Sequence, residues 1–223
     1  MRPLIRELAE TVILALLIFV ALQLSVQTYR VEGLSMEPTL EQDQHLFVNK
    51  LVYLHIDPAD LANRLPFVNV KRKKPLFPFH PPRRGEVIIF RFPVDPSRDF
   101  VKRVIGEPGD TVEIQHGQVF VNGEALEEPY LIARSRRSMA LRTVAPEFYF
   151  VLGDNRPVSD DSRSWGQVPV DNVIGRAWVS YWPLDRIQTL SLLGSRAHDR
   201  EWQRTGGVTL VRAIVSAAAK MSH

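Results

Sequence analysis

The sequence predicts a mainly β protein: a single N-terminal transmembrane helix, then an all-β domain that is a barrel or a sandwich, with a barrel-like form preferred. Three observations support this fold class. Positions 12–22 are eleven consecutive apolar residues. From residue 46 to residue 182, short β-prone runs alternate with turn-forming Gly, Pro, Asn and Asp, as is typical of all-β folds. Beyond residue 30, helical periodicity is absent until the C-terminus.

Length and composition exclude several other classes of protein. The chain has 223 residues, 45% hydrophobic and 24% charged, which indicates a globular protein and not a disordered or collagen-like one. It has no cysteine, which excludes disulfides, thiolate nucleophiles and iron–sulfur clusters. The net charge of +3 is too small to indicate a nucleic-acid-binding protein, so no nucleic-acid partner is predicted.

The first predicted element is a membrane anchor, within residues 1–28. The apolar stretch covers residues 8–26, close to the ~20 residues that a spanning helix needs. A cleaved signal peptide is one alternative, but no small-x-small cleavage site follows the run. A buried core helix is another, but eleven apolar residues in a row leave no polar face. Arg2 and Arg6 outnumber Arg30, which predicts a cytoplasmic N-terminus and a β domain outside the inner cell membrane.

A β-rich domain is predicted over residues 29–190. Its strands are runs of apolar and β-branched residues bounded by turn residues. In chain order they are 46–48, 51–54, 87–92, 99–106, 111–114, 119–121, 148–152 and 173–182. The turn at His116-Gly117 predicts that two of these strands form a β-hairpin.

Two basic segments and a tail complete the organisation. Residues 57–85 are predicted to be an insertion loop, because five prolines fall between positions 66 and 82. This loop and a variable segment at 129–146 are rich in Lys and Arg and nearly free of acidic residues. Both are interpreted either as solvated loops or as contacts with anionic lipid, and loop 66–82 is the candidate for an interfacial contact. Residues 191–223 are predicted to be a tail with a short amphipathic helix.

Several common catalytic motifs are absent. The six histidines show no metal-ligand spacing, so neither a metal nor a cofactor is predicted. Ser35 follows Gly33 at the right distance for a Gly-x-Ser-x-Gly elbow, but Glu37 stands where the second glycine is required. The segment from Gly106 to Gly109 is a turn signal and not a phosphate-binding loop.

What remains is a set of separated polar motifs. Ser35 lies within the segment from Gly33 to Leu40, shortly after the apolar run. Lys102 lies in a strand-like apolar segment. A third motif, from Gly153 to Arg156, precedes three further polar residues: Ser159, Asp161 and Arg163. A serine hydroxyl is a weak nucleophile that needs a base, and burial can lower the pKa of a lysine far enough for it to act as one.

Together and in this order, the motifs resemble those of the bacterial type I signal peptidases, or leader peptidases, a family of membrane Ser–Lys endopeptidases. The resemblance covers about residues 1–182. It implies that Ser35 is the nucleophile and Lys102 the general base. It also implies that Ser159 holds the Lys102 amine by a hydrogen bond, and that an ion pair between Asp161 and Arg163 supports this loop. The implied substrate-pocket residues are Met36, Leu40, Phe100 and Val101.

The implied activity is cleavage of N-terminal signal peptides from exported preproteins, with small residues preferred at the first and third positions before the cut. Two departures from the family pattern matter. Gly33 replaces a serine that contributes to the oxyanion hole in some members, which leaves the backbone N–H of Ser35, and that of Gly33, for this role. The pair Pro157-Val158 replaces a usually polar pair, which affects the local turn and not the dyad.

Two other functions are weighed against this one. A non-catalytic, membrane-anchored β domain could bind exported chains with an inactive site, but the joint presence of Ser35, Lys102 and Ser159 argues against it. A related self-cleaving Ser–Lys protease would need a DNA-binding domain, whereas this N-terminus is an apolar helix.

Overall fold

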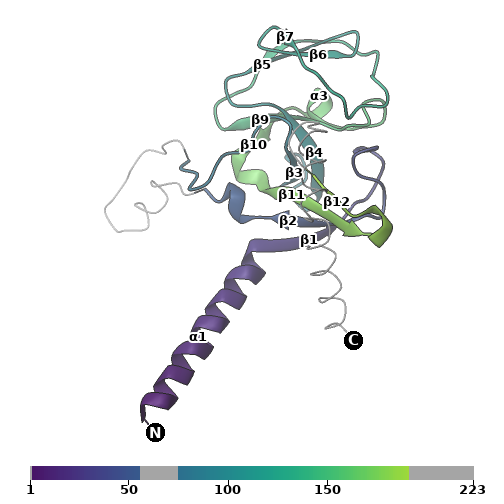
Figure 1. The fold of residues 1–223 in the computed structure, drawn as a ribbon. Helices are drawn as coiled ribbons and strands as arrows, with labels where there is room; N and C mark the ends of the chain where they lie inside the picture. Colours follow the sequence, from purple (N-terminus) through teal and green to yellow (C-terminus); the bar gives the residue numbers. More distant parts are fainter. Residues whose placement is uncertain (1, 56–74, 191–223) are drawn as a thin grey trace, which may run out of the picture.

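The computed structural model describes residues 2–55 and 75–190 (Figure 1). Most of the predicted insertion loop and the whole predicted tail, with its short helix, lie outside the described residues. The long N-terminal helix α1 (Arg2–Ser25) projects away from a β-rich body and continues without a break into strand β1 (Val26–Arg30) (Figure 1).

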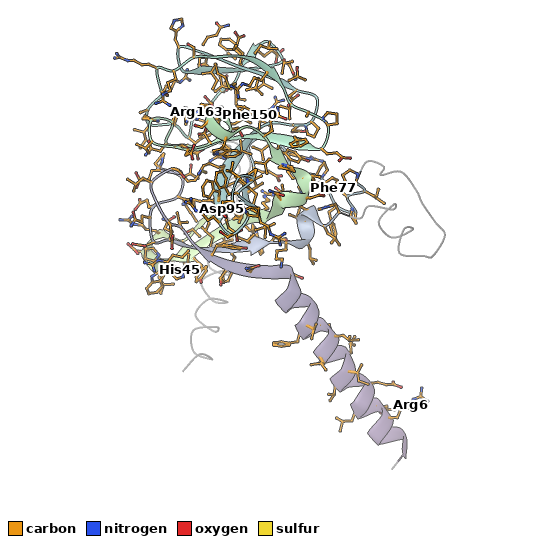
Figure 2. All side chains as sticks on the ribbon, turned by 180° about the vertical axis from the view of Figure 1, so that it is seen from behind. Arg6, His45, Phe77, Asp95, Phe150 and Arg163 are labelled. Carbon is orange, nitrogen blue, oxygen red and sulfur yellow. The ribbon has the colours of Figure 1, made fainter. Side chains whose placement is uncertain are left out.

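The described large apolar side chains of α1 are 44–66% exposed, and the helix extends away from the β-rich body (Figure 2). They are Leu8, Val12, Ile13, Leu14, Leu16, Leu17, Ile18, Phe19 and Val20. Within the described part of the chain, no helix combines the length and the apolar character that a membrane span requires.

The larger sheet is antiparallel and carries the segments that matter for the site. Besides β1, it contains β2 (His45–Asn49), β3 (Val87–Arg91), β4 (Asp99–Gly106), β9 (Phe148–Leu152), β10 (Val168–Pro169), β11 (Val173–Trp182) and β12 (Gln188–Thr189). Its order is β1-β2-β11-β3-β4-β9-β10, and β12 pairs with β11. The strand order is open, with β1 at one edge and β10 at the other, so the described strands do not close into a barrel.

A smaller antiparallel sheet lies at the end of the molecule opposite α1 (Figure 1). It contains β5 (Thr111–Gln115), β6 (Gln118–Val121), β7 (Glu124–Ala125) and β8 (Met139–Thr143), in the order β7-β6-β5-β8. Its apolar face packs against β4 and β9 through a fully buried cluster that includes Ile105, Val112, Val119 and Phe150. The side chains of β4 and β9 therefore connect the two sheets.

The mainly β class is confirmed, and so is the hairpin, because β5 and β6 pair antiparallel around residues 116–117. Residues 51–54 were predicted as a strand and are not: Leu51–Tyr53 form a 3-10 turn, labelled η1. The cause is Asn49, whose side-chain oxygen accepts hydrogen bonds from the backbone N–H groups of Leu51 and Val52 and turns the chain.

Other short elements were not predicted. Strand β1 lies in a polar stretch without an apolar run, and β8 lies inside the basic segment 129–146; both form by pairing with a neighbouring strand. The two-residue strands β7, β10 and β12 and three one-turn helices were also not predicted; the helices are α3 (Ser162–Trp165), η2 (Val170–Asn172) and η3 (Leu184–Arg186). The basic segment is therefore partly a strand and not only a solvated loop.

Candidate active site

Ser35 lies in a tight turn between β1 and β2. Gly33 adopts a φ of 82°, a left-handed conformation that a side chain would strain, and so lets the chain turn just before the serine. The carbonyl of Ser35 accepts a hydrogen bond of 3.0 Å from the backbone N–H of Asn155. The serine is thereby attached to the loop after β9, which is far away in the sequence.

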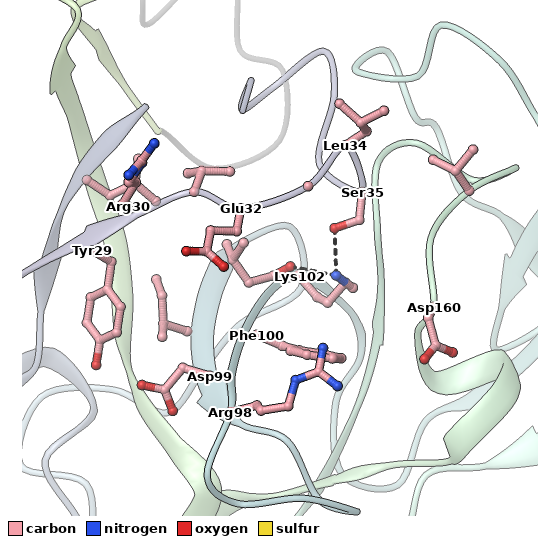
Figure 3. Close-up of a pocket in the computed structure, with 16 residues that line it drawn as sticks. Tyr29, Arg30, Glu32, Leu34, Ser35, Arg98, Asp99, Phe100, Lys102 and Asp160 are labelled. Atoms are coloured by element: carbon pink, nitrogen blue, oxygen red, sulfur yellow. Dashed lines mark hydrogen bonds between the residues drawn. The ribbon is translucent and has the colours of Figure 1, made fainter. Parts of the chain in front are cut away.

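Lys102 reaches this serine from the larger sheet. It lies in β4 opposite Ile88 of β3, and it is only 4% exposed. Its amine Nζ lies 2.7 Å from Oγ of Ser35 and donates to the carbonyl of Val101 at 3.0 Å (Figure 3). The amine also lies 5.3 Å from the centre of the Phe100 ring. The serine hydroxyl and a buried amine are therefore within direct proton-transfer distance.

Burial lowers the pKa of Lys102 to about 8, from an ordinary value near 10.5. Removing the ammonium ion from water disfavours the charged form, and this is the largest cause. The negative charges of Asp161, Asp160 and Asp154 act in the opposite direction and keep the pKa from falling further. A sizeable fraction of Lys102 is therefore neutral near pH 8, and only the neutral amine can accept a proton.

Ser159 does not make the expected hydrogen bond to Lys102. Its Oγ is buried, and among the described residues it has no hydrogen-bond partner. Gly153 lies directly between Ser159 and Ser35: a Cβ atom there would lie 2.1 Å from Oγ of Ser159 and 2.5 Å from the Ser35 carbonyl oxygen. Ser159 is thus placed next to the serine's backbone, across a glycine that no larger residue could replace.

Asp161 and Arg163 form an ion pair. Asp161 is fully buried, and Nε and Nη2 of Arg163 donate to its two oxygens at 2.7 Å and 2.8 Å. The same Nη2 donates to the carbonyls of Arg156 and Ser159 at 2.8 Å and 3.2 Å. One guanidinium therefore holds both ends of the loop that carries Ser159.

A second, deeper ion pair lies below the serine. The Arg103 guanidinium donates to both oxygens of Asp154, at 2.9 Å and 2.6 Å, and these side chains are 5% and 0% exposed. The Thr39 hydroxyl donates to Asp154, and the Arg103 guanidinium stacks 4.0 Å from the centre of the Tyr130 ring. Burial alone would lower the pKa of Arg103, but the hydrogen bonds and charge of Asp154 more than offset it and hold the pKa above its usual value.

The segment from Gly153 to Arg156 was recognised as a motif in the sequence, but no role was predicted for its charged residues. Besides Asp154, Arg156 of this segment pairs with buried Glu128, and Tyr130 donates to Glu128 at 3.0 Å. One signal was present: Lys102 and Arg103 are adjacent in an apolar strand, so one of the two must face each side of the sheet. Their carboxylate partners could not be identified without the fold.

A groove of about 670 Å³ leads to Ser35 and Lys102 (Figure 3). One wall runs from Tyr29 to Ser35, and the other from Arg98 to Lys102. Phe100 and Val101 line it, as predicted for the substrate pocket. Met36 and Leu40, predicted with them, do not: both are fully buried in the core cluster behind Val101. The side chains of Met36 and Leu40 point into the core, where they anchor the turn that carries Ser35.

This arrangement defines a class of enzyme. A serine hydroxyl hydrogen-bonded to a buried lysine of lowered pKa, at the end of an open groove, is the arrangement that a serine hydrolase with a lysine base requires. Among the described residues, no cluster of three or more His, Asp or Glu could hold a metal ion.

Comparison with known proteins identifies the family. Residues 4–182 match the family model described as signal peptidase, peptidase S26, and the chain belongs to this family, whose members are serine endopeptidases. The chain is 38% identical over 184 residues to signal peptidase I of Leptolyngbya laminosa, with 77% of this chain and 78% of that protein covered. It is 31% identical over 231 residues to signal peptidase I of Pseudomonas aeruginosa, with coverages of 84% and 77%.

Among solved structures, the chain is similar to a signal peptidase I from Enterococcus faecalis, with 35% sequence identity. The match has a TM-score of 0.40 and covers 44% of this chain and 97% of the other.

Proposed function

We propose that this chain cleaves N-terminal signal peptides from exported preproteins, with Ser35 as the nucleophile and Lys102 as the general base. One observation carries the assignment of these roles: the 2.7 Å hydrogen bond between the Lys102 amine and the Ser35 hydroxyl. Membership of the signal peptidase family and the substrate named in its description support the choice of signal peptides as substrate.

The proposed reaction starts with neutral Lys102. Its amine takes the proton of the Ser35 hydroxyl as Oγ attacks the scissile carbonyl carbon, which forms a tetrahedral oxyanion. The ammonium then gives its proton to the leaving amine, and an acyl-enzyme remains on Ser35. Lys102 next removes a proton from a water molecule as the water oxygen attacks the ester carbonyl, and the ammonium returns this proton to Oγ of Ser35 as the ester bond breaks. The backbone N–H of Ser35, with that of Gly33, is assigned to stabilise the oxyanion.

Three residues of the loop after β9 are assigned supporting roles. Asp161 and Arg163 keep the loop in place through their ion pair and the two backbone carbonyls that Arg163 holds. Ser159 is assigned to positioning the Lys102 amine, because its buried Oγ lies close to the backbone of Ser35 across Gly153 and has no hydrogen-bond partner among the described residues. The groove residues Phe100 and Val101 are assigned to contact small side chains of an extended substrate.

The direct test is processing of an exported precursor by detergent-solubilised protein. The wild type is expected to release the mature protein with a single new N-terminus, identified by mass spectrometry, and Ser35→Ala is expected to release none. Binding of the precursor by Ser35→Ala in the same detergent is the control for folding. Equal processing by the two proteins would refute the assignment of the nucleophile.

We infer that residues 1–28 contain the membrane anchor and that residues 29–190 form the catalytic domain outside the inner membrane, followed by the tail at 191–223. What supports the anchor is the apolar run at 8–26, counted over the full sequence, which approaches the ~20 residues of a span. The exposure of its described apolar side chains is a second support, because so large an apolar surface in contact with water would be unfavourable.

The orientation predicts a protease result. Protease added to intact spheroplasts should digest the domain beyond residue 30, because the excess of Lys and Arg before the run favours a cytoplasmic N-terminus. An antibody against the β domain gives the readout, and a cytoplasmic protein serves as the control for intact cells. Survival of the domain until the membrane is broken would show the opposite orientation.

We also propose that loop 66–82 touches the membrane surface. Leu76 and Phe79 support this, since they are 60% and 64% exposed. Phe77, a third apolar residue of this loop, does not join them, because it packs against the core cluster of Phe90 and Tyr149 and against His55. Residues 66–74, with the lysines at 71, 73 and 74, lie outside the described part of the chain.

A vesicle assay tests this contact. A protein truncated to begin at residue 26 should bind anionic vesicles in a salt-sensitive way, because each Lys or Arg near such a surface contributes ~1 kcal/mol. The double variant Leu76→Ser with Phe79→Ser should bind several-fold more weakly, and it leaves the packed Phe77 intact. Exposed Val94, changed to Ser, is the matched control. Unaltered binding by the double variant would refute the contact.

A further inference from the structure

A second cavity lies between β8 and the short helix α3, away from the groove. Its volume is about 330 Å³, and its lining combines three arginines with two serines. These residues are Arg137, Arg142, Arg163, Ser138 and Ser164, beside Ile114, Met139 and Ala140. No carboxylate lines the cavity among the described residues, and because Arg163 is paired with buried Asp161, the excess positive charge of the lining belongs to Arg137 and Arg142.

Two of these arginines have no acidic partner within the described part of the chain. Arg137 and Arg142 make no ion pair there, both are exposed, and both line the cavity. Guanidinium groups of like charge that converge on one cavity repel each other unless an anion lies between them. The basic segment 129–146, whose charge the catalytic site does not use, supplies both of them.

The third arginine connects the cavity to the catalytic loop. The side chain of Arg163 is 13% exposed, and its Nε and Nη2 are fully used by Asp161 and by the carbonyls of Arg156 and Ser159. Its Nη1 has no partner among the described residues, and Arg163 is part of the cavity lining. A planar guanidinium presents its donors as a fixed fork, so one side holds the loop while Nη1 is available to a ligand.

We propose that this cavity binds a phosphate-type oxyanion, held by Arg137, Arg142 and Nη1 of Arg163. Ser138 and Ser164 also line the cavity, and a hydroxyl can donate to an anion; Oγ of Ser138 keeps its own donor capacity while it accepts from the backbone N–H of His116. Because the same guanidinium holds both ends of the Ser159 loop, a bound anion restricts Arg163 and so reduces opening of residues 156–161. The bound anion would thus stabilise the loop that carries Ser159, and it would enter the cavity from the side of the smaller sheet.

The anion comes from the aqueous phase and not from a lipid headgroup. The smaller sheet lies at the opposite end of the molecule from α1, so this cavity is remote from the end where the anchor leaves the domain (Figure 1). A phosphate group in solution and one on a lipid share the same chemistry, and a competition experiment separates the two sources.

Calorimetric titration of the detergent-solubilised full chain with inorganic phosphate tests the site, at constant ionic strength maintained with chloride. Saturable binding is expected for the wild type. Arg137→Gln and Arg142→Gln should each raise Kd about ten- to hundredfold, the effect of losing one hydrogen bond to a charged group. Arg136→Gln is the matched control, because Arg136 lies in the same segment, is exposed and does not line the cavity.

Absence of saturable binding, or an equal loss in Arg136→Gln, would overturn the site. Hydrogen exchange tests the link to the loop: the N–H groups of Val158 and Ser159 donate to the Asn155 carbonyl and should exchange more slowly with phosphate in the wild type but not in Arg142→Gln. Unchanged exchange at saturating phosphate would overturn the link. Displacement of phosphate by phosphatidylglycerol in the micelles would overturn the aqueous source. None of these readouts depends on peptide cleavage, so they remain informative even if the proposed peptidase function fails.

Discussion

Changing Lys102 to arginine or to methionine is expected to abolish cleavage, with kcat/KM falling by about 10³- to 10⁴-fold, the contribution of a lost general base. Arginine keeps a basic side chain, but its guanidinium stays protonated at any working pH and cannot accept the serine proton. Methionine removes the base while filling a similar volume in a buried site, so the fold should persist. Circular dichroism of both variants provides the control for folding.

The dependence of kcat/KM on pH tests directly whether Lys102 is the group that accepts the proton. Since the pKa of Lys102 is lowered to about 8, kcat/KM should rise about tenfold per pH unit below 8 and level off above it. Asp160 raises this pKa by its charge, so Asp160→Asn should move the midpoint to lower pH while the plateau remains. An acid limb that stays in place when Lys102 is changed, or substantial turnover by Lys102→Arg, would show that another group takes the proton.

Asp154→Ala is expected to destabilise the domain by about 3–5 kcal/mol, because it leaves the Arg103 guanidinium buried without its partner. That is a large part of the roughly 5–15 kcal/mol that holds a typical domain folded. The Thr39 hydroxyl loses its acceptor at the same time. Urea unfolding measures the change as a lower midpoint with an unchanged slope.

Two controls isolate the unpaired charge as the cause. Glu41→Ala breaks the ion pair of Glu41 with Arg186, whose side chains are 47% and 52% exposed, and should cost less than about 1 kcal/mol. The double change Arg103→Met with Asp154→Leu removes both charges and should recover much of the loss. If Asp154→Ala is no more costly than Glu41→Ala, Arg103 is hydrated in the variant and the deep pair contributes little.

Local signals in the sequence predicted the local structure well. The hairpin of β5 and β6 follows from two alternating runs around His116-Gly117, and β9 and β11 follow from uninterrupted β-prone runs. Strand β8 could not be predicted in the same way, because its exposed pattern has no apolar face and its formation depends on pairing with β5. The turn at η1 depends on one side chain, that of Asn49, whose hydrogen bonds override the β propensity of the residues that follow.

In the candidate active site, too, the features that depend on contacts between distant residues could not be predicted from local sequence signals. Spacing alone says nothing about the proximity of Ser35 and Lys102, which are 67 residues apart; their pairing was expected only from the family resemblance. The same resemblance placed Met36 in the pocket, where the structure has it in the core, and placed Ser159 on Lys102, where the structure has it against Gly153. Residue identities transfer between relatives more reliably than side-chain directions, which depend on packing across the sheet.

The junction between α1 and β1 has a mechanical consequence. The helix ends at Ser25 and the strand begins at Val26, and the Ser25 carbonyl accepts a 2.9 Å hydrogen bond from the backbone N–H of Lys50. No linker residue separates the helix from the sheet, and this hydrogen bond connects the last residue of α1 to the residue after β2. Rotation of the sheet about the end of the helix is therefore restricted. The five residues of β1 span about 17 Å, and the turn that carries Ser35 follows this strand directly. If α1 is held in a bilayer, Ser35 can therefore lie only within a limited distance of the membrane surface, and peptide bonds presented farther away are out of its reach.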